Sequence, residues 1–218
     1  MSRGFFVKGN IMSISRRGFL AGLPIFLAGC TAAGTEYRSA MLNYAALPDE
    51  SFPLRAVPLD KIKPELRRQE VAYETKHPKG TVVVDTPARR LYYVMGDGRA
   101  MRYGIGVGKE GLALRGNATV GRKAQWPSWT PTANMISRDP RNREFAGGVP
   151  GGPNNPLGAR ALYLHRGGRD TMFRIHGTNQ PQSIGHAMSS GCVRMLNHDV
   201  IDLYERVPVG AKVVVIQA

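Results

Sequence analysis

From residue 80 onward, short apolar runs alternate with turns that contain Pro, Gly or Asp. Short runs rich in Val, Ile, Leu and Tyr predict β-strands. The predicted strands are Thr81–Asp85, Arg90–Met95, Arg99–Val107, Ala161–Leu164, Met172–Ile175 and Lys212–Ile216. Asp97-Gly98 lies between the second and third of these runs, and this dipeptide is typical of a two-residue hairpin turn.

One segment near the end has a helical pattern instead. Asn197 suits the N-cap position, and the apolar residues after it recur on one helical face. These are Val200, Leu203, Tyr204 and Val207. Residues 126–158 have little regular pattern, and so long a connection within a compact domain is usually functional or mobile. We predict a mainly β fold, a single β-sandwich or barrel-like domain over residues 80–218, with one short helix and a long cleft loop.

The preceding residues lack this strand pattern. Residues 30–79 are polar and irregular and contain several prolines, with at most a short helix between Asp60 and Arg68. Such composition is typical of a linker and not of an independent core. We predict that residues 30–79 form a tether that also packs on the domain.

Residues 1–29 have the composition of an export signal. They contain four basic and no acidic residues, and an apolar run that ends in small residues. The apolar run is too short for a stable membrane span. The pair Arg16-Arg17 resembles the twin-arginine motif, although the general secretory route stays open. Met12 is an alternative start that gives a signal of ordinary length.

Leu27-Ala-Gly-Cys30 resembles a bacterial lipobox. The resemblance implies that Cys30 is acylated and becomes the new terminus, so that the membrane is contacted only through this lipid. The alternative is cleavage a few residues later, near Ala33, which would release a soluble form. Both hypotheses place the mature protein in the periplasm or cell envelope.

The net charge of +14 invites a nucleic-acid interpretation. Four of the positive charges belong to residues 1–29, which leaves +10 for the rest of the chain. No basic stripe or recognisable nucleic-acid module is present, and export would separate the protein from nucleic acid. We expect no nucleic-acid partner.

Cys192 is the thiol that remains once Cys30 is lipidated or removed, and an unpaired Cys in an oxidising compartment suggests reactivity. Gly191 permits a tight turn before it, and Arg194 supplies positive charge that favours the thiolate. His176, at the end of a predicted strand, could take the thiol proton and return it to a leaving amine. The alternative is a small buried Cys near a hydrogen-bonded His.

Two blocks surround these residues: Ile175-His-Gly-Thr-Asn179, and Ser189-Ser-Gly-Cys-Val-Arg-Met-Leu-Asn197. Together with Asn155-Pro-Leu-Gly158 and Trp126-Pro-Ser-Trp-Thr-Pro131, they resemble the bacterial L,D-transpeptidases of the YkuD type. In one variant of the family pattern, His stands at position 190 and Asn at position 194. The subclass and the acyl acceptor therefore stay open.

The resemblance implies catalytic roles for individual residues. Cys192 would be the nucleophile, and His176 the general base and acid, with its ring oriented by the carbonyl of Gly177. Backbone amides at Gly191 and Cys192 would form the oxyanion hole. A thioester divides one difficult amide exchange into two easier acyl transfers, so no cofactor and no metal is expected.

The resemblance also implies the substrate. Cys192 would attack the third residue of a peptidoglycan stem peptide, usually meso-diaminopimelate, and release D-Ala. The acceptor would be a second diaminopimelate, a lysine of a wall-anchored protein or another amine, whereas water would make the enzyme an L,D-carboxypeptidase. Arg194 would bind a substrate carboxylate. Apart from the resemblance, we expect Ser190 to contact substrate, with a turn role as the alternative. We also expect Trp126 and Trp129 of the long loop to line or cover the cleft, with Trp126 in contact with substrate and packing as the alternative.

Three other hypotheses are weaker. His165, His186 and His198 lack zinc-ligand spacing, although His186 could replace His176 as the base. A papain-like hydrolase would place Cys before His in the chain, the reverse of the order here. A non-catalytic cell-wall binding module would keep the fold without the chemistry, and the presence of both His176 and Cys192 argues against it.

Overall fold

The computed structural model describes Met1 and residues 38–108, 114–188 and 191–217. The predicted export signal and Cys30 lie outside the described residues. No helix in the described part of the chain is long and apolar enough to cross a membrane.

Most of the described strands form one large sheet. In spatial order they are β1 (Gln69–Ala72), β4 (Arg99–Gly104), β3 (Arg90–Gly96), β2 (Val82–Asp85), β11 (Lys212–Ile216), β6 (Gly116–Gln125), β7 (Arg160–Arg166), β8 (Arg169–His176) and β10 (Val193–Arg194). The pairs β2–β11 and β8–β10 are parallel, and the other neighbours are antiparallel. A small parallel sheet joins β5 (Val107–Gly108) to β9 (Ala187–Met188).

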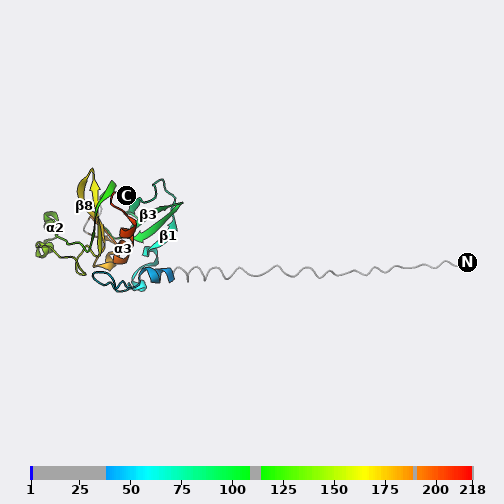
Figure 1. The fold of residues 1–218 in the computed structure, drawn as a ribbon, viewed down its shortest axis with the longest axis horizontal. Helices are drawn as coiled ribbons and strands as arrows, with labels where there is room; N and C mark the ends of the chain where they lie inside the picture. The colour runs from blue at the N-terminus through cyan, green and yellow to red at the C-terminus, as the bar shows by residue number, and fades with distance from the viewer. Residues whose placement is uncertain (2–37, 109–113, 189–190, 218) are drawn as a thin grey trace.

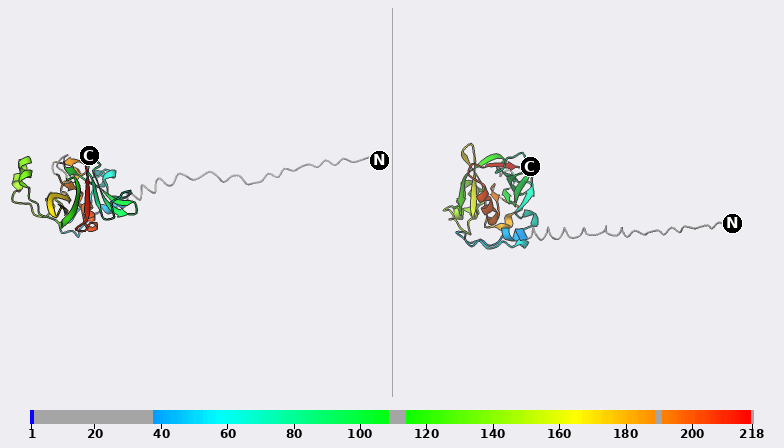
Figure 2. Two further views of the ribbon diagram at one scale, coloured as in Figure 1. Left: turned by 90° about the horizontal axis from the view of Figure 1, so that it is seen from above. Right: turned by 45° about the vertical axis from the view of Figure 1, so that its right-hand side comes forward.

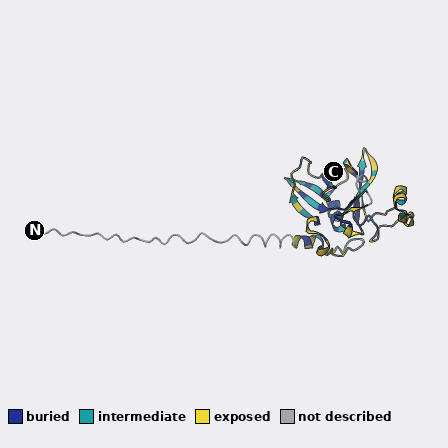
Figure 3. Ribbon diagram, turned by 180° about the vertical axis from the view of Figure 1, so that it is seen from behind, coloured by how far each residue is buried: buried dark blue, intermediate teal, exposed yellow. Residues whose placement is uncertain are grey.

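The large sheet curves around helix α3 (Asn197–Arg206). Figure 1 shows α3 between a wing that contains β8 and a wing that contains β3, and Figure 2 shows the C-terminal strand β11 between them. Buried residues from both wings and from α3 form one core, and buried residues are dark blue in the ribbon of Figure 3. Representative members are Val84, Leu91, Tyr103, Leu162, Ile175, Val193, Leu203 and Val213. The prediction of a mainly β fold with one short helix after Cys192 is confirmed.

The hairpin between β3 and β4 has the predicted turn. Asp97 and Gly98 adopt φ angles of 51° and 68°, and a type I′ turn requires positive φ at both central positions. Strand β6 was not predicted, because Gly116–Gln125 is mostly polar. Only Ala118 and Val120 of this strand belong to the core, and its place in the middle of the sheet comes from pairing with β11 and β7.

The long connection between β6 and β7 contains two short helices. Helix α2 (Ala133–Arg138) begins after Thr132, whose hydroxyl accepts a hydrogen bond from the amide of Met135. A 3₁₀ segment, η3 (Pro140–Phe145), follows it. Figure 1 shows that this connection projects from the body of the domain.

The segment before the domain contributes more regular structure than the sequence predicted. Residues 38–43 are helical, and the expected helix between Asp60 and Arg68 is replaced by two 3₁₀ turns, Leu59–Lys61 and Pro64–Leu66. Strand β1 extends the sheet by pairing with β4. Prolines and β-pairing between distant residues explain why no local pattern predicted this arrangement.

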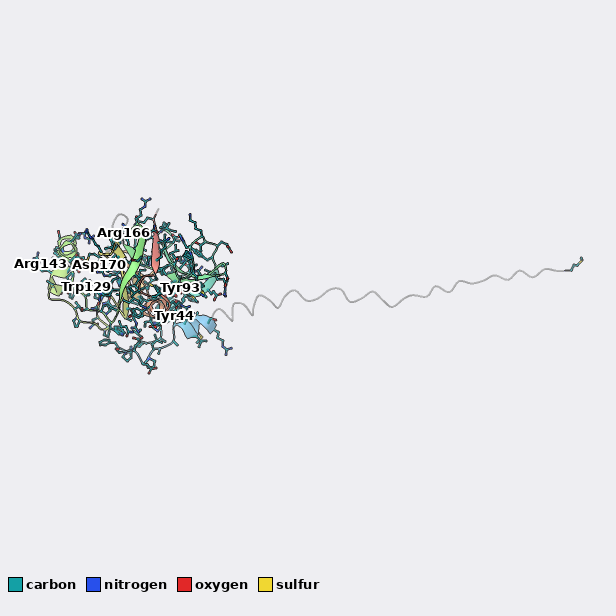
Figure 4. The ribbon with its side chains drawn as sticks, turned by 45° about the horizontal axis from the view of Figure 1, so that its top comes forward. Tyr44, Tyr93, Trp129, Arg143, Arg166 and Asp170 are labelled. Carbon is teal, nitrogen blue, oxygen red and sulfur yellow. The ribbon has the colours of Figure 1, made fainter. Side chains whose placement is uncertain are left out.

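Tyr44, labelled in Figure 4, links the segment before residue 80 to α3 through hydrogen bonds. Its buried hydroxyl accepts a hydrogen bond from the amide of Arg68 at 2.6 Å and donates one to Asp199 at 3.2 Å. Arg68 also lies 3.1 Å from Asp202, on the next turn of α3, and 3.9 Å from Asp199. The segment is therefore held by a buried polar network as well as by apolar contacts.

Asp199 has an unusual acidity in this network. Its pKa is raised to about 7, mainly by burial and also by the charge of Asp202, while Arg68 and the Tyr44 hydroxyl oppose the increase. Because the folded protein binds this proton more tightly than the unfolded chain does, protonation of Asp199 stabilises the fold. That stabilisation is fully present below the unfolded pKa of about 3.9 and is lost progressively as the pH rises to and through 7.

We expect the pH dependence of stability to reveal this proton. The free energy of unfolding of the wild type, minus that of Asp199→Asn, should increase by about 1–3 kcal/mol when the pH falls from 8 to 5. Urea unfolding at intervals across this range measures it, and all histidines are common to both proteins. Parallel stability curves would show that the Asp199 pKa is not raised in the fold.

Candidate active site

The pairing of β8 with β10 fixes the positions of the predicted catalytic residues. Ile175 is paired with Val193, and His176 with Arg194, in parallel register. Ile175 and Val193 both belong to the core. Because successive side chains in a strand point to opposite faces, His176 and Arg194 point away from the core.

The same register extends over four strands and creates two rows of side chains on this outer face. One row runs from β6 to the residue that precedes β10, and the other lies beside it. The first row consists of Arg122, Tyr163, Arg174 and Cys192. The second row consists of Ala124, Ala161, His176 and Arg194. All of these residues except Ala161 line one cleft.

The cleft has a volume of about 350 Å³. Its floor is the two rows, and much of its wall comes from the connection that carries α2. The wall residues are Pro127, Ser128, Trp129, Thr130, Thr132, Met135, Pro156 and Leu157. Figure 4 labels Trp129 and Asp170 on the side of the molecule where this connection projects. The long loop expected at a cleft therefore lines one.

His176 is held in one tautomer. Its Nδ1 lies 2.6 Å from the carbonyl oxygen of Gly177. Because a carbonyl oxygen can only accept a hydrogen bond, the proton is on Nδ1 and the lone pair is on Nε2. The structure thus places Gly177 where the resemblance implied an orienting carbonyl.

Burial lowers the pKa of His176 to about 4, and the positive charges of Arg194 and Arg174 contribute to the decrease. The hydrogen bond to Gly177 opposes it. The imidazole is therefore neutral at neutral pH and has an available lone pair.

Cys192 is half-buried and unpaired. Burial raises the pKa of its thiol, whereas a hydrogen bond from the backbone of Arg174 and the charges of Arg174 and Arg194 lower it. The outcome is a raised pKa, so the thiol is mainly protonated at neutral pH. The site at rest therefore contains a neutral thiol and a neutral imidazole.

Asn197 holds the backbone beside His176. Its side-chain oxygen accepts hydrogen bonds from the amides of Ala159 at 3.0 Å and Thr178 at 3.2 Å. The approach is so close that a Cβ atom on Gly158 or Gly177 would lie 2.2 Å from this oxygen. The expectation that Asn197 is an N-cap is wrong: it is the first residue of α3, and its side chain stabilises two neighbouring loops.

Arg194 is positioned by its backbone and its side chain. Its amide and carbonyl bond to Gly106 at 2.8 and 2.9 Å, and its guanidinium donates to the side-chain oxygen of Gln180 at 3.4 Å. Arg194 lines the cleft next to His176, its partner in the pairing of β10 with β8. Its role in binding a substrate carboxylate stays a prediction.

Trp126 does not lie in the cleft, which corrects the expectation that it contacts substrate. Its indole is buried against Phe52, with ring centres 4.9 Å apart, and donates a hydrogen bond to Glu50 at 3.0 Å. Glu50 also binds Arg160 at 2.6 Å. Trp126 therefore packs against the N-terminal segment, and Trp129 is the tryptophan that lines the cleft.

Two predicted residues are placed only in part. Ser190 lies outside the described residues. Gly191 precedes Cys192 in the chain and lines a small cavity together with Val193. The oxyanion hole at Gly191 and Cys192 stays a prediction.

Sequence analysis missed Arg174, Tyr163 and Arg122. Arg174 could have been found, because alternation in β8 puts residues 174 and 176 on the same face. The others required the register of neighbouring strands. His186 lines a different pocket, and His198 contacts the carbonyl of Ala45 at 2.9 Å. Among the described residues, no group of three side chains could hold a metal ion.

The arrangement is suited to acyl transfer. A thiol next to a neutral imidazole can form a covalent acyl intermediate, since the imidazole can take and return one proton. Three arginines line the cleft, and its described lining contains no Asp or Glu. The cleft therefore favours a substrate that carries negative charge.

Comparison with known proteins gives the same family. "Probable L,D-transpeptidase YbiS" from Escherichia coli K12 is 39% identical over 149 residues, covering 67% of this chain and 47% of the relative. "Probable L,D-transpeptidase ErfK/SrfK" from the same organism is 38% identical over 139 residues, covering 62% of this chain and 43% of the relative. The chain thus spans less than half the length of these two curated relatives.

Among solved structures, a Brucella melitensis protein described as a "Probable carnitine operon oxidoreductase caia" is 51% identical, with a TM-score of 0.49, and covers 71% of this chain and 96% of its own. A family model described as the L,D-transpeptidase catalytic domain, YkuD, matches residues 79–215. On that match and the curated relatives, the chain belongs to the L,D-transpeptidase catalytic domain family.

Proposed function

We propose that this protein is an L,D-transpeptidase that acts on peptidoglycan stem peptides through a thioester on Cys192. The observation that carries the proposal is the placement of His176, at the end of β8, and Cys192, just before the adjacent strand β10, in one cleft, with the lone pair of His176 on Nε2. Membership in the L,D-transpeptidase family supports the reaction class. Because the chain matches only part of its relatives, its substrate and acceptor belong to this proposal.

The first half of the reaction forms the thioester. Nε2 of His176 takes the proton of Cys192, and the sulfur attacks the carbonyl carbon of the third stem residue. The imidazolium then gives its proton to the nitrogen of the terminal D-Ala as the carbon–nitrogen bond breaks. D-Ala leaves as an amine, and the peptide is held as a thioester.

The second half transfers the peptide to an amine. The acceptor nitrogen attacks the thioester carbon and loses a proton to Nε2 of His176. The carbon–sulfur bond breaks, and the thiolate recovers the proton. A diaminopimelate acceptor gives a 3–3 crosslink, a protein lysine gives an anchored protein, and water gives carboxypeptidase activity.

Substrate binding would change the basicity of His176. In the free protein, the charges of Arg194 and Arg174 help to hold the pKa of His176 at about 4. A substrate carboxylate bound near these arginines would partly neutralise their charge, and so would raise the basicity of the imidazole. The base would then be strongest when a substrate is present, and the pKa of the Cys192 thiol would rise with it, because the same arginines lower that pKa.

Loss of the thiol should abolish acylation. Cys192→Ala should form no covalent adduct with a tetrapeptide stem or with a carbapenem, and should release no D-Ala. His176→Ala should slow D-Ala release on the order of 100-fold or more, because it removes the general base. Intact-protein mass spectrometry and a D-Ala assay measure both effects. An adduct that persists in Cys192→Ala would refute the proposal.

The reactivity of Cys192 should increase with pH in the way expected for a thiol whose pKa is raised by burial. The rate of its alkylation by iodoacetamide should rise with a midpoint above ~8.5, the usual thiol pKa. Arg194→Gln should move the midpoint upward, since the guanidinium stabilises the thiolate. A midpoint below 7 would instead indicate a thiolate–imidazolium pair in the free protein.

We also propose that the protein is exported and lipid-anchored. The basic and apolar residues 1–29 and the lipobox-like sequence at Cys30 support this location. Cells fed an alkyne fatty acid should label the wild type and leave Cys30→Ser unlabelled, and the variant should appear in the soluble fraction. Equal labelling of both proteins, or a wild type found in the cytoplasm, would contradict this location.

A further inference from the structure

One row of the cleft floor contains a stack that the reaction above does not use. The ring of Tyr163 lies between two guanidinium groups, with Arg122 at 3.5 Å and Arg174 at 4.3 Å from its centre. Direct cross-strand pairing on β6, β7 and β8 produces this stack. Tyr163 is buried, so its position is fixed.

The two arginines differ in how their charge is compensated. Arg174 donates two hydrogen bonds to the carboxylate of Asp170, at 2.6 and 2.8 Å. Arg122 is exposed, and within the described part of the chain its one polar contact is the stack on Tyr163. The uncompensated charge of the stack is therefore on Arg122.

Stacking also orients Arg122. A guanidinium that lies flat on an aromatic ring keeps its N–H groups at the edge, where they can donate two parallel hydrogen bonds to a carboxylate. An arginine held in this way loses less side-chain entropy on binding than a free one does. Arg122 is thus prepared to bind a planar anion.

The position of Arg122 relates it to the nucleophile. Arg122 lies on β6, and its guanidinium extends to 3.5 Å from the ring centre of Tyr163 on β7. Tyr163 lies two strand spacings, about 10 Å, from β10, which Cys192 directly precedes. An extended peptide covers this distance with about three residues. A peptide acylated at Cys192 and lying across the cleft floor would bring a nearby residue to Arg122.

We propose that Arg122, stacked on Tyr163, binds a carboxylate of the peptide substrate and so determines specificity for acidic over amidated stems. This inference rests on the proposed transpeptidase function and adds a second contact for negative charge at the opposite end of the floor from Arg194. Arg174 supports it as a positioning residue, because it packs on the other face of the ring.

Paired substrates test the proposal. Tetrapeptide stems that differ in one group, a free carboxylate or its carboxamide, are compared for the kcat/KM of acylation and of amine transfer. The wild type should prefer the acid on the order of 10-fold, and Arg122→Gln should bring the ratio close to one. Arg122→Lys should retain part of the preference, because it keeps the charge but loses the planar fork.

Controls separate this effect from general loss of charge. Arg169→Gln removes one positive charge at the exposed start of β8 and should leave the ratio of acid to amide unchanged. The preference of the wild type should decrease at high salt, since an exposed contact is screened. Thermal unfolding should show all variants folded.

The outcomes distinguish this inference from the proposed function. If Arg122→Gln loses the preference for the acid in the acylation step, the recognised carboxylate belongs to the donor peptide. If it loses this preference in the transfer step, the carboxylate belongs to the acceptor. If Arg122→Gln changes both substrates equally, or not at all, Arg122 does not recognise a carboxylate. If the wild type is acylated by no stem peptide, the transpeptidase function itself is wrong, and this inference is overturned with it.

Discussion

The short parallel pairing of β8 with β10 is the interaction on which the rest of the site depends. A shift of one residue would turn His176 and Arg194 toward the core and Ile175 and Val193 toward the cleft. Burial of the two apolar side chains makes such a shift costly, so the core enforces the register of the site. Further hydrogen bonds lock it, from the amide of Met195 to the carbonyl of His176 at 2.8 Å, and between Arg194 and Gly106.

Asn197 provides the complementary constraint at the end of β8. By binding the amides of Ala159 and Thr178, it fixes the peptide that carries the carbonyl of Gly177. That carbonyl determines which nitrogen of His176 holds the proton. Glycine at 158 and 177 follows from the same geometry, because a larger residue would displace the Asn197 side chain. One carboxamide thus connects helix α3, two loops and the tautomer of the base.

The sequence predicted those features that depend on local pattern. Apolar runs identified most strands of the two wings, and the blocks around His176 and Cys192 identified the cleft residues that the structure brings together. Features that depend on pairing between distant segments were not predicted. Strand β6 is polar and owes its place to its neighbours, Trp126 is held by Glu50 and Phe52 from the N-terminal segment, and the Arg122–Tyr163–Arg174 stack exists only in cross-strand register.

Burial and the nearby charges together determine the ionisation of the two reactive groups, the Cys192 thiol and the His176 imidazole. Burial opposes the charged form of both the thiol and the imidazole, whereas the nearby arginines favour the thiolate and oppose the imidazolium. Burial therefore disfavours a thiolate–imidazolium pair, while the effects of the arginines on its two members oppose each other. Arg174 is already paired with Asp170, so a carboxylate bound beside the two reactive groups would act mainly on Arg194. A carboxylate bound there would raise the pKa of both groups, so the transfer of the proton from Cys192 to His176 depends on their fixed positions in the cleft and not on the charge of the substrate alone.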